Sequence, residues 1–160
     1  MDDLASLHGD IDHQLAEWLD GPWLGEGHVP DLDHLGHMRG HQVRPDSPAL
    51  WDDVPGALVG RVLVVGTGDH LSVSLTHHEI GHALERMHQH ADHEPWQLIM
   101  ARCMPVLLAE RYRNPYEWWA ESWAMVAVGE LGRLLRMLSE DQAAAERVAS
   151  YHRRYYGLRR

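Results

Sequence analysis

The sequence predicts a mostly helical α+β protein, built as a single domain over residues 1–160 with a small β-sheet. Three observations support this class. The chain has 160 residues, which is long enough for one hydrophobic core and too short for two. Apolar residues make up 44% of the sequence and charged residues 24%, as in ordinary folded domains. Helical periodicity recurs along the chain, whereas one segment is clearly rich in β-branched residues.

Residues 1–56 are expected to form an N-terminal helix and an irregular segment that wraps the body. Apolar residues recur at helical spacing from Leu4 to Leu19, after which turn-forming residues end the helix. From 21 to about 55 the chain is rich in Gly, Pro, His and Asp and has weak periodicity. The spacing of four histidines in this segment could suit a second metal, but no cysteine or carboxylate pattern fixes the geometry. They are therefore interpreted as scattered surface residues: His28, His34, His37 and His41.

Residues 57–128 are expected to form the central core. A strand is predicted over 57–65, because the segment is rich in β-branched residues and ends in a glycine-containing turn. Helices are predicted over about 73–88, 96–110 and 115–128. Pro105 should kink the 96–110 helix or end its first half.

Residues 129–160 are expected to form C-terminal helices. The helical pattern runs from about 130 to 156 and is broken near Ser139. Ser139, together with Asp141 and Gln142, resembles the N-cap of a new helix.

Composition limits the partners that we expect. The formal net charge of −10 argues against general nucleic-acid binding, because phosphate contacts need a clustered basic surface. No stretch is long enough to span a bilayer, and the N-terminus lacks the pattern of a signal peptide. The single cysteine, Cys103, lies in an apolar run, where burial is expected. We therefore expect no nucleic-acid or membrane partner and a location that is cytoplasmic, or exported without a cleaved signal peptide. Nothing in the sequence indicates an oligomeric state.

A His-Glu-x-x-His pattern in the helix predicted over 73–88 indicates a metal site. His78 and His82 are four residues apart, so on a helix their imidazoles project from one face and can bind one metal together. Glu79 directly follows the first histidine, and in this arrangement its carboxylate reaches the metal-bound water as a general base. Chance is the alternative explanation, because the chain contains 14 histidines. The apolar neighbours argue against chance, since burying these polar groups without a metal would leave them unpaired.

A hydrolytic zinc site needs a third protein ligand and an open position for water. Glu117 is the first candidate, because the helix predicted over 115–128 places Glu117 and Glu121 on one face. Asn114 as N-cap, Pro115 and Glu117 also suit a simple capping arrangement. Capping explains Glu117 without a metal but does not explain Glu121.

His88 is the second candidate for the third ligand. The spacing of His78, His82 and His88 is that of metzincins, in which a glycine breaks the helix so that the third histidine can turn back. Here Glu85 occupies that position and favours a continuous helix, which would carry His88 away from the face of His82. We therefore prefer Glu117 to His88.

At these residues the chain resembles a known family. Two motifs occur in order, His78-Glu79-Ile80-Gly81-His82-Ala83 and Glu117-Trp118-Trp119-Ala120-Glu121-Ser122-Trp123-Ala124. Together they resemble the catalytic domain of the anthrax lethal factor-like zincin peptidases, whose second motif is Glu-aromatic-aromatic-Ala-Glu-x-aromatic-Ala. The resemblance covers residues 57–128, and the remaining chain matches only in general character. Immunity-type peptidases that cleave phage repressors have a related motif with asparagine in the position of Glu121, and they rank second.

The resemblance implies a zincin-like metallopeptidase fold, with the catalytic core over 57–128 and the small sheet beside the active-site helix. It implies that Glu117 is the third zinc ligand and that Glu121 orients a zinc-bound histidine, a role that is also physically reasonable. It further implies a tyrosine upstream of Glu117 that hydrogen-bonds the tetrahedral intermediate. The usual spacing falls on Glu110, so Tyr112 is our choice and the adjacent Tyr116 is the alternative.

The expected function is that of a zinc-dependent metalloendopeptidase acting on a peptide or protein. Zinc lowers the pKa of its water, Glu79 takes the proton, and the proton passes to the leaving amine after attack on the peptide carbonyl. The strand over 57–65 is expected to pair with an extended substrate, as the family resemblance suggests. The alternatives are a peptidase of the repressor-cleaving or metzincin-like type, metal-dependent hydrolysis of a non-peptide, and a non-catalytic metal-binding phage or toxin-associated protein. The intact Glu79 argues against the last of these.

Overall fold

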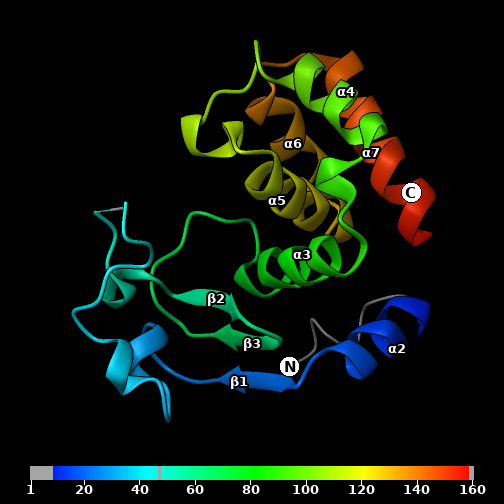
Figure 1. The fold of residues 1–160 in the computed structure, drawn as a ribbon. Coiled ribbons are helices and arrows are strands. Elements are labelled where there is room, and N and C mark those ends of the chain that lie inside the picture. The colour runs from blue at the N-terminus through cyan, green and yellow to red at the C-terminus, as the bar shows by residue number, and fades with distance from the viewer. Residues whose placement is uncertain (1–8, 47, 159–160) are drawn as a thin grey trace.

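The computed structural model describes residues 9–46 and 48–158. Helix α3, Leu75–His88, lies between a three-stranded sheet and the remaining helices of the second half of the chain (Figure 1). The sheet covers one side of α3, and α5, Pro115–Ala127, covers another. Helix α2, Gly9–Trp18, matches the described part of the predicted N-terminal helix, whereas Leu4 and Leu7 lie outside the described residues. The predicted α+β class, with a small sheet beside a mostly helical body, is confirmed.

The segment over 57–65 forms two strands, so the prediction of one strand is wrong. Strands β2, Gly56–Val59, and β3, Val62–Val65, form an antiparallel hairpin in which Val59 pairs with Val62. The two-residue turn begins at Gly60, whose φ of 63° suits the first central position of a type II′ turn. Only a glycine adopts this conformation without strain. The turn was missed because the apolar residues on both sides of Gly60 and Arg61 were interpreted as one strand.

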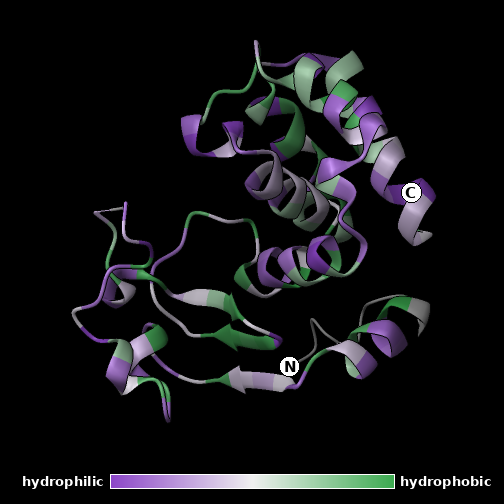
Figure 2. Ribbon diagram, in the orientation of Figure 1, coloured by the Kyte–Doolittle hydropathy of each residue, from purple (hydrophilic) through white to green (hydrophobic). Residues whose placement is uncertain are grey.

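The predicted irregular segment begins with a strand. Strand β1, Gly21–Leu24, pairs in parallel with β3, which gives the sheet order β1-β3-β2. β3 is therefore central and β2 is an edge strand. The hydropathy colouring shows β3 as hydrophobic along its length (Figure 2), in keeping with its central place. After β1 the chain forms short 3-10 turns, and Val29, Leu32 and Leu35 of this region pack against Val64 of β3.

The helices of the second half follow the predicted order. α3 and α5 match the predictions over 73–88 and 115–128, and Asn114 caps α5 by accepting hydrogen bonds from the N–H groups of the next turn. α4, Glu94–Cys103, is shorter than the predicted 96–110 helix, because Pro105 cannot continue a helix. A separate 3-10 turn, Glu110–Arg113, follows. None of the described helices combines the length and the apolar character needed to cross a membrane.

The predicted break near Ser139 separates α6, Leu131–Met137, from α7, Gln142–Tyr156. The N-cap of α7 is Asp141, whose carboxylate accepts a hydrogen bond of 3.0 Å from the Ala144 N–H. Ser139 instead adopts a left-handed conformation with φ of 51°, so it ends α6 rather than beginning α7.

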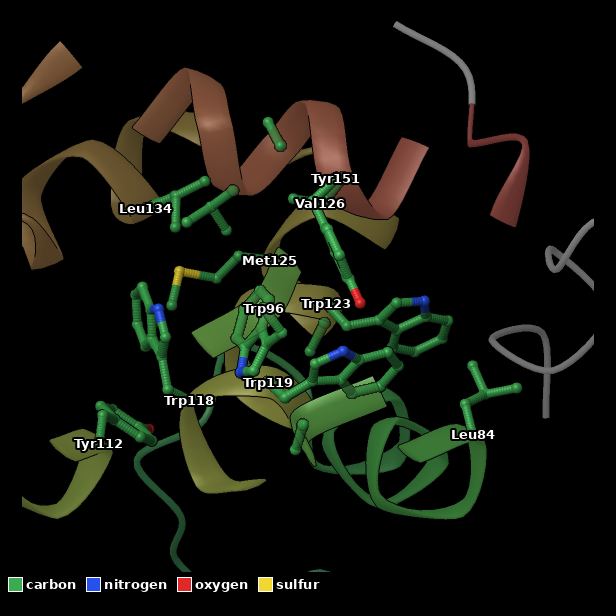
Figure 3. Packing of buried hydrophobic residues seen from close by; sticks show 14 of the residues in the cluster. Leu84, Trp96, Tyr112, Trp118, Trp119, Trp123, Met125, Val126, Leu134 and Tyr151 are labelled. Atoms are coloured by element: carbon green, nitrogen blue, oxygen red, sulfur yellow. The ribbon is translucent and has the colours of Figure 1, made fainter. Parts of the chain in front are cut away.

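Tryptophans dominate the core between α5 and its neighbours (Figure 3). Four indole side chains are completely buried, those of Trp96, Trp118, Trp119 and Trp123. Replacing one such side chain by alanine typically costs about 3–5 kcal/mol of stability. Cys103 is also buried, as predicted.

Gly81 sets the distance between α3 and α5. A Cβ atom at this position would lie 2.8 Å from the Ala120 Cα atom and 2.9 Å from the Ala120 carbonyl oxygen. Both atoms are backbone, so any larger residue would force the helices apart. Because the two helices meet closely here, side chains one turn away on either helix can reach one another.

Candidate metal centre

Three potential metal ligands converge where α3 faces α5. The Nε2 atoms of His78 and His82 lie 3.1 Å apart. The Oε2 atom of Glu117 lies 3.7 Å from the first and 3.8 Å from the second. Within the described residues, these three form the one group of three or more His, Cys, Asp or Glu side chains with ligand atoms within 4.8 Å of one another.

The separations between these atoms suit a small tetrahedral cation. For metal–ligand bonds of about 2.0–2.1 Å, two tetrahedral ligands lie about 3.3 Å apart, close to the three distances observed here. Two imidazoles and one carboxylate are also a common donor set of catalytic zinc sites, which leave the fourth position open. The residues therefore fit zinc both in chemistry and in spacing.

Glu121 fixes the orientation of His78. This carboxylate has no exposed surface, and its Oε2 atom accepts a hydrogen bond of 2.9 Å from the His78 Nδ1 atom. Its Oε1 atom accepts from the Val73 N–H at 3.1 Å. Because a carboxylate only accepts, Nδ1 must carry the proton, which directs the other nitrogen of His78 toward His82 and Glu117.

The two histidines have opposite pKa shifts. Burial lowers the pKa of His78, but the contacts with Glu117 and Glu121 outweigh burial and raise it to about 9. Burial and the neighbouring positive His78 lower the pKa of His82 to about 4. The pair thus holds one positive charge between two facing nitrogens. Such an environment favours a cation at this point.

Glu79 lies beside the ligands on the sheet side of α3. It is only 5% exposed, and burial raises the pKa of its carboxyl to about 7. The positive charge of His78 and a hydrogen bond from the Leu58 backbone N–H partly offset the effect of burial. Leu58 belongs to β2, the edge strand, so this bond shows that the unpaired edge of β2 faces the site. A carboxylate whose pKa lies near neutrality is suited to accept and return a proton.

Two cavities meet at the ligands. One, of about 340 Å³, is lined by His78, Glu79, Gly56, His70 and Arg111, among others. The other, of about 750 Å³, is lined by the same His78 and Glu79 with His82, Leu58, Tyr116 and Glu117, among others. Both contain residues of β2, so together they form a groove along the edge strand.

The other predicted site residues, Tyr112, Tyr116 and His88, differ in where they lie relative to the three potential ligands. Tyr112 is 2% exposed and packs against Trp118, away from the lining of both cavities (Figure 3). Tyr116 does line the larger cavity, but its hydroxyl donates to Asp92 at 2.7 Å. His88 lies at the end of an unbroken α3 and its ring approaches those of His90 and Tyr156.

Sequence reasoning missed several groove residues. The segment described as an irregular wrap contributes four of them to the larger cavity: Val43, Arg44, Trp51 and Val54. Arg111, on the 3-10 turn, lines the smaller cavity. No periodicity or motif marks these positions. The one feature of the sequence that could have indicated Arg111 is its position next to Tyr112, which was predicted to lie in the site.

Comparison with known proteins adds a fold relative. The sequence matches no protein-family model and no curated protein sequence. Among solved structures, the fold is similar to that of the Pro-Pro endopeptidase from Paenibacillus alvei, with a TM-score of 0.72 and 21% identity. The match covers 94% of this chain and 87% of the endopeptidase. This likeness establishes the zincin-like α+β fold of the chain.

Proposed function

We propose that the protein is a zinc-dependent metalloendopeptidase. The observation that supports this most strongly is the convergence of His78, His82 and Glu117 beside a buried Glu79, at the unpaired edge of a β-strand. The fold relative cleaves peptide bonds, as its name states, which supports the same class of reaction for this chain.

The residues divide the chemistry between them. Zinc, when bound to His78, His82 and Glu117, would supply a Lewis acid that polarises a carbonyl and acidifies water. Glu79 takes the proton from the attacking water and returns it to the leaving amine. Glu121 holds His78 in place throughout.

The edge strand β2 is the proposed substrate-binding strand. All four residues of β2 have a partner on β3, but only Ala57 and Val59 lie at hydrogen-bonded positions of the hairpin. The backbone groups of Gly56 and Leu58 therefore point to the unpaired edge, in keeping with the bond from the Leu58 N–H to Glu79. An extended peptide would add to this edge and cross the metal ligands. The sequence predicted that the whole segment over 57–65 pairs with the substrate. The sheet order restricts this pairing to β2, because β3 already has a neighbouring strand on each side.

Membership of the lethal factor-like group is part of the proposal. The two sequence motifs support it, because they fall on α3 and α5 and face each other there. We also propose that residues 1–160 act as one catalytic domain, with the core over 57–128.

The test compares the wild-type protein with Glu79→Gln on a peptide library, with product identification by mass spectrometry. We expect cleavage by wild type in the presence of zinc and at least about 1,000-fold slower cleavage by the variant. Both proteins should contain about one zinc, because Glu79 is not a proposed ligand. Absence of cleavage by zinc-loaded wild type would favour the non-catalytic metal-binding alternative. Equal cleavage by Glu79→Gln would remove Glu79 as the base.

A further inference from the structure

We propose that Arg111 is the residue that donates a hydrogen bond to the substrate carbonyl oxygen as negative charge develops on it, and that Tyr112 is a positioning residue for Arg111. The inference rests on the proposed peptidase function. It assigns to a guanidinium the task that the family resemblance gave to a tyrosine.

The positions of the two neighbours support this division. Arg111 is exposed and lines the smaller cavity together with His78 and Glu79. Tyr112, the next residue, is 2% exposed and packs in the core beside Trp118. A substrate in the groove would therefore meet the guanidinium and not the phenol.

The hydroxyl of Tyr112 is already engaged on both sides. Its oxygen accepts a hydrogen bond of 2.5 Å from the Arg111 Nη2 atom. Its O–H donates to the Glu121 carboxylate, and burial together with this carboxylate holds the pKa of the phenol well above its usual range. A phenol in this position keeps its proton and directs it away from the groove.

The same contacts hold Arg111 in place. The guanidinium carbon lies 4.4 Å from the centre of the Tyr112 ring, in a cation–π arrangement. A chain of contacts thus runs from Arg111 through Tyr112 and Glu121 to His78. A guanidinium has five N–H donors, so the bond to Tyr112 leaves donors for a ligand.

Other donors near the ligands are less well suited. The Tyr116 hydroxyl donates to Asp92, and the His70 Nδ1 atom is bonded to the Ser72 carbonyl at 3.1 Å. Unlike Tyr116 and His70, Arg111 carries a permanent positive charge, which stabilises a developing oxyanion more than a neutral donor does. Two further arginines line only the larger cavity, where Arg86 donates to the Gly60 carbonyl at 3.1 Å and the charge of Arg44 acts on the Glu117 carboxylate.

The kinetic test compares Arg111→Ala, Arg111→Lys, Arg113→Ala and Tyr112→Phe with the wild type, on a peptide from the library that the wild type cleaves. Removing an oxyanion donor typically lowers kcat by about 100–1,000-fold, and we expect this for Arg111→Ala, with KM changed less than about threefold. Added guanidinium should restore part of the activity, and Arg111→Lys should retain more activity than Arg111→Ala. Arg113→Ala is the matched control, because Arg113 belongs to the same turn but is absent from the lining of both cavities. It should retain wild-type kcat.

Tyr112→Phe separates positioning from catalysis. We expect a loss of about tenfold in kcat, with the dependence on pH above pH 8 unchanged, because no tyrosine proton takes part. A larger loss than in Arg111→Ala, or removal of an alkaline limb that wild type shows, would overturn the inference in favour of Tyr112. An Arg111→Ala enzyme with wild-type kcat would also overturn it.

A binding measurement keeps this inference distinct from the peptidase proposal. Methylphosphonate, a small tetrahedral anion, is titrated calorimetrically into the zinc-loaded wild type, Arg111→Ala and Arg113→Ala. We expect affinity to fall at least tenfold in Arg111→Ala alone. If wild type cleaves no peptide, the peptidase proposal fails, while this result would still assign anion recognition at the site to Arg111. Equal affinity of the three proteins would overturn the inference.

Discussion

Two adjacent residues of α5, Glu121 and Ser122, each contact a histidine, and the two histidines behave in opposite ways. Glu121 holds His78 on the groove side, where contacts with carboxylates raise the imidazole pKa to about 9. On the core side, the Ser122 hydroxyl lies 2.9 Å from the His152 Nε2 atom. Burial there lowers the pKa of His152 to about 3.

The comparison teaches that the partner on α5, rather than burial alone, decides what each histidine can do. His78 is 8% exposed and His152 is 0% exposed, so both are largely removed from water. His152 packs against Trp96 and Trp119, and among the residues that the structure describes no carboxylate raises its pKa. One helix therefore separates a site that attracts a cation from a core that excludes charge.

Removing a ligand on the groove side should have the largest effect. For Glu117→Ala we expect the affinity for zinc to fall at least about 100-fold, because two histidines alone bind zinc weakly. Elemental analysis of the purified protein measures the loss. His88→Ala is the control and should retain about one zinc. The opposite pattern would move the third ligand to His88 and contradict the site proposed here.

A change at Glu121 tests the contact that distinguishes His78 from His152. Glu121→Gln keeps a hydrogen-bond acceptor for His78 but removes the charge. We expect about 10- to 100-fold weaker zinc binding, measured by competition with a chromophoric chelator. Unchanged affinity would mean that the charge of Glu121 does not support His78.

The core histidine should make stability depend on pH. The folded-state pKa of His152, about 3, lies below the unfolded value of about 6.5, so the unfolded state binds the proton more readily. This contribution is complete above about pH 6.5 and is lost as pH falls toward about 3. His152 alone should account for a loss of about 2 kcal/mol between pH 7.5 and pH 5. The loss is measured as the difference in urea unfolding between wild type and His152→Gln, because a group with a raised pKa, such as His78, contributes in the opposite direction.

His152→Gln isolates this contribution from that of His90, whose pKa is also lowered by burial, to about 4. The variant cannot titrate at this position, so its stability should decline less over the same interval. An identical decline in the two proteins would show that His152 is not the source.

The smallest effect is expected at the serine. Ser122→Ala leaves the His152 Nε2 atom without this hydrogen bond, at a cost of about 1 kcal/mol. Urea unfolding at pH 7.5 measures it, with the exposed Ser150→Ala on α7 as a control that should lie within about 0.5 kcal/mol of wild type. Equal stability of the Ser122 and Ser150 variants would mean that the hydroxyl contributes nothing to His152.

The sequence predicted the parts of this comparison that depend on helical geometry. α3 and α5 were recognisable from periodicity and from the cap at Asn114, and the i, i+4 spacing of His78 and His82 placed both on one face. Their meeting with Glu117 required a helix–helix approach that no local pattern specifies. The carboxylates were identified as candidates, but the closeness of α3 and α5 became visible only in three dimensions.

Other features had no readable local pattern. The hairpin was missed because the apolar residues on both sides of Gly60 and Arg61 resemble one continuous strand. β1 was missed because it has only four residues, Gly21–Leu24. The orientations of Arg111 and Tyr112 depend on a 3-10 turn, in which neither a period of 2 nor one of 3.6 predicts which side chain is buried.

Gly81 controls the ligand spacing of the candidate metal centre. The proposed ligands come from two rigid helices, so their spacing follows the separation of α3 and α5, which is fixed where Gly81 meets Ala120. A methyl group at position 81 would widen the ligand set without altering any ligand. Attempts to re-engineer the site for a larger ion should therefore begin with this contact, and natural drift at position 81 should be constrained as tightly as at the ligands themselves.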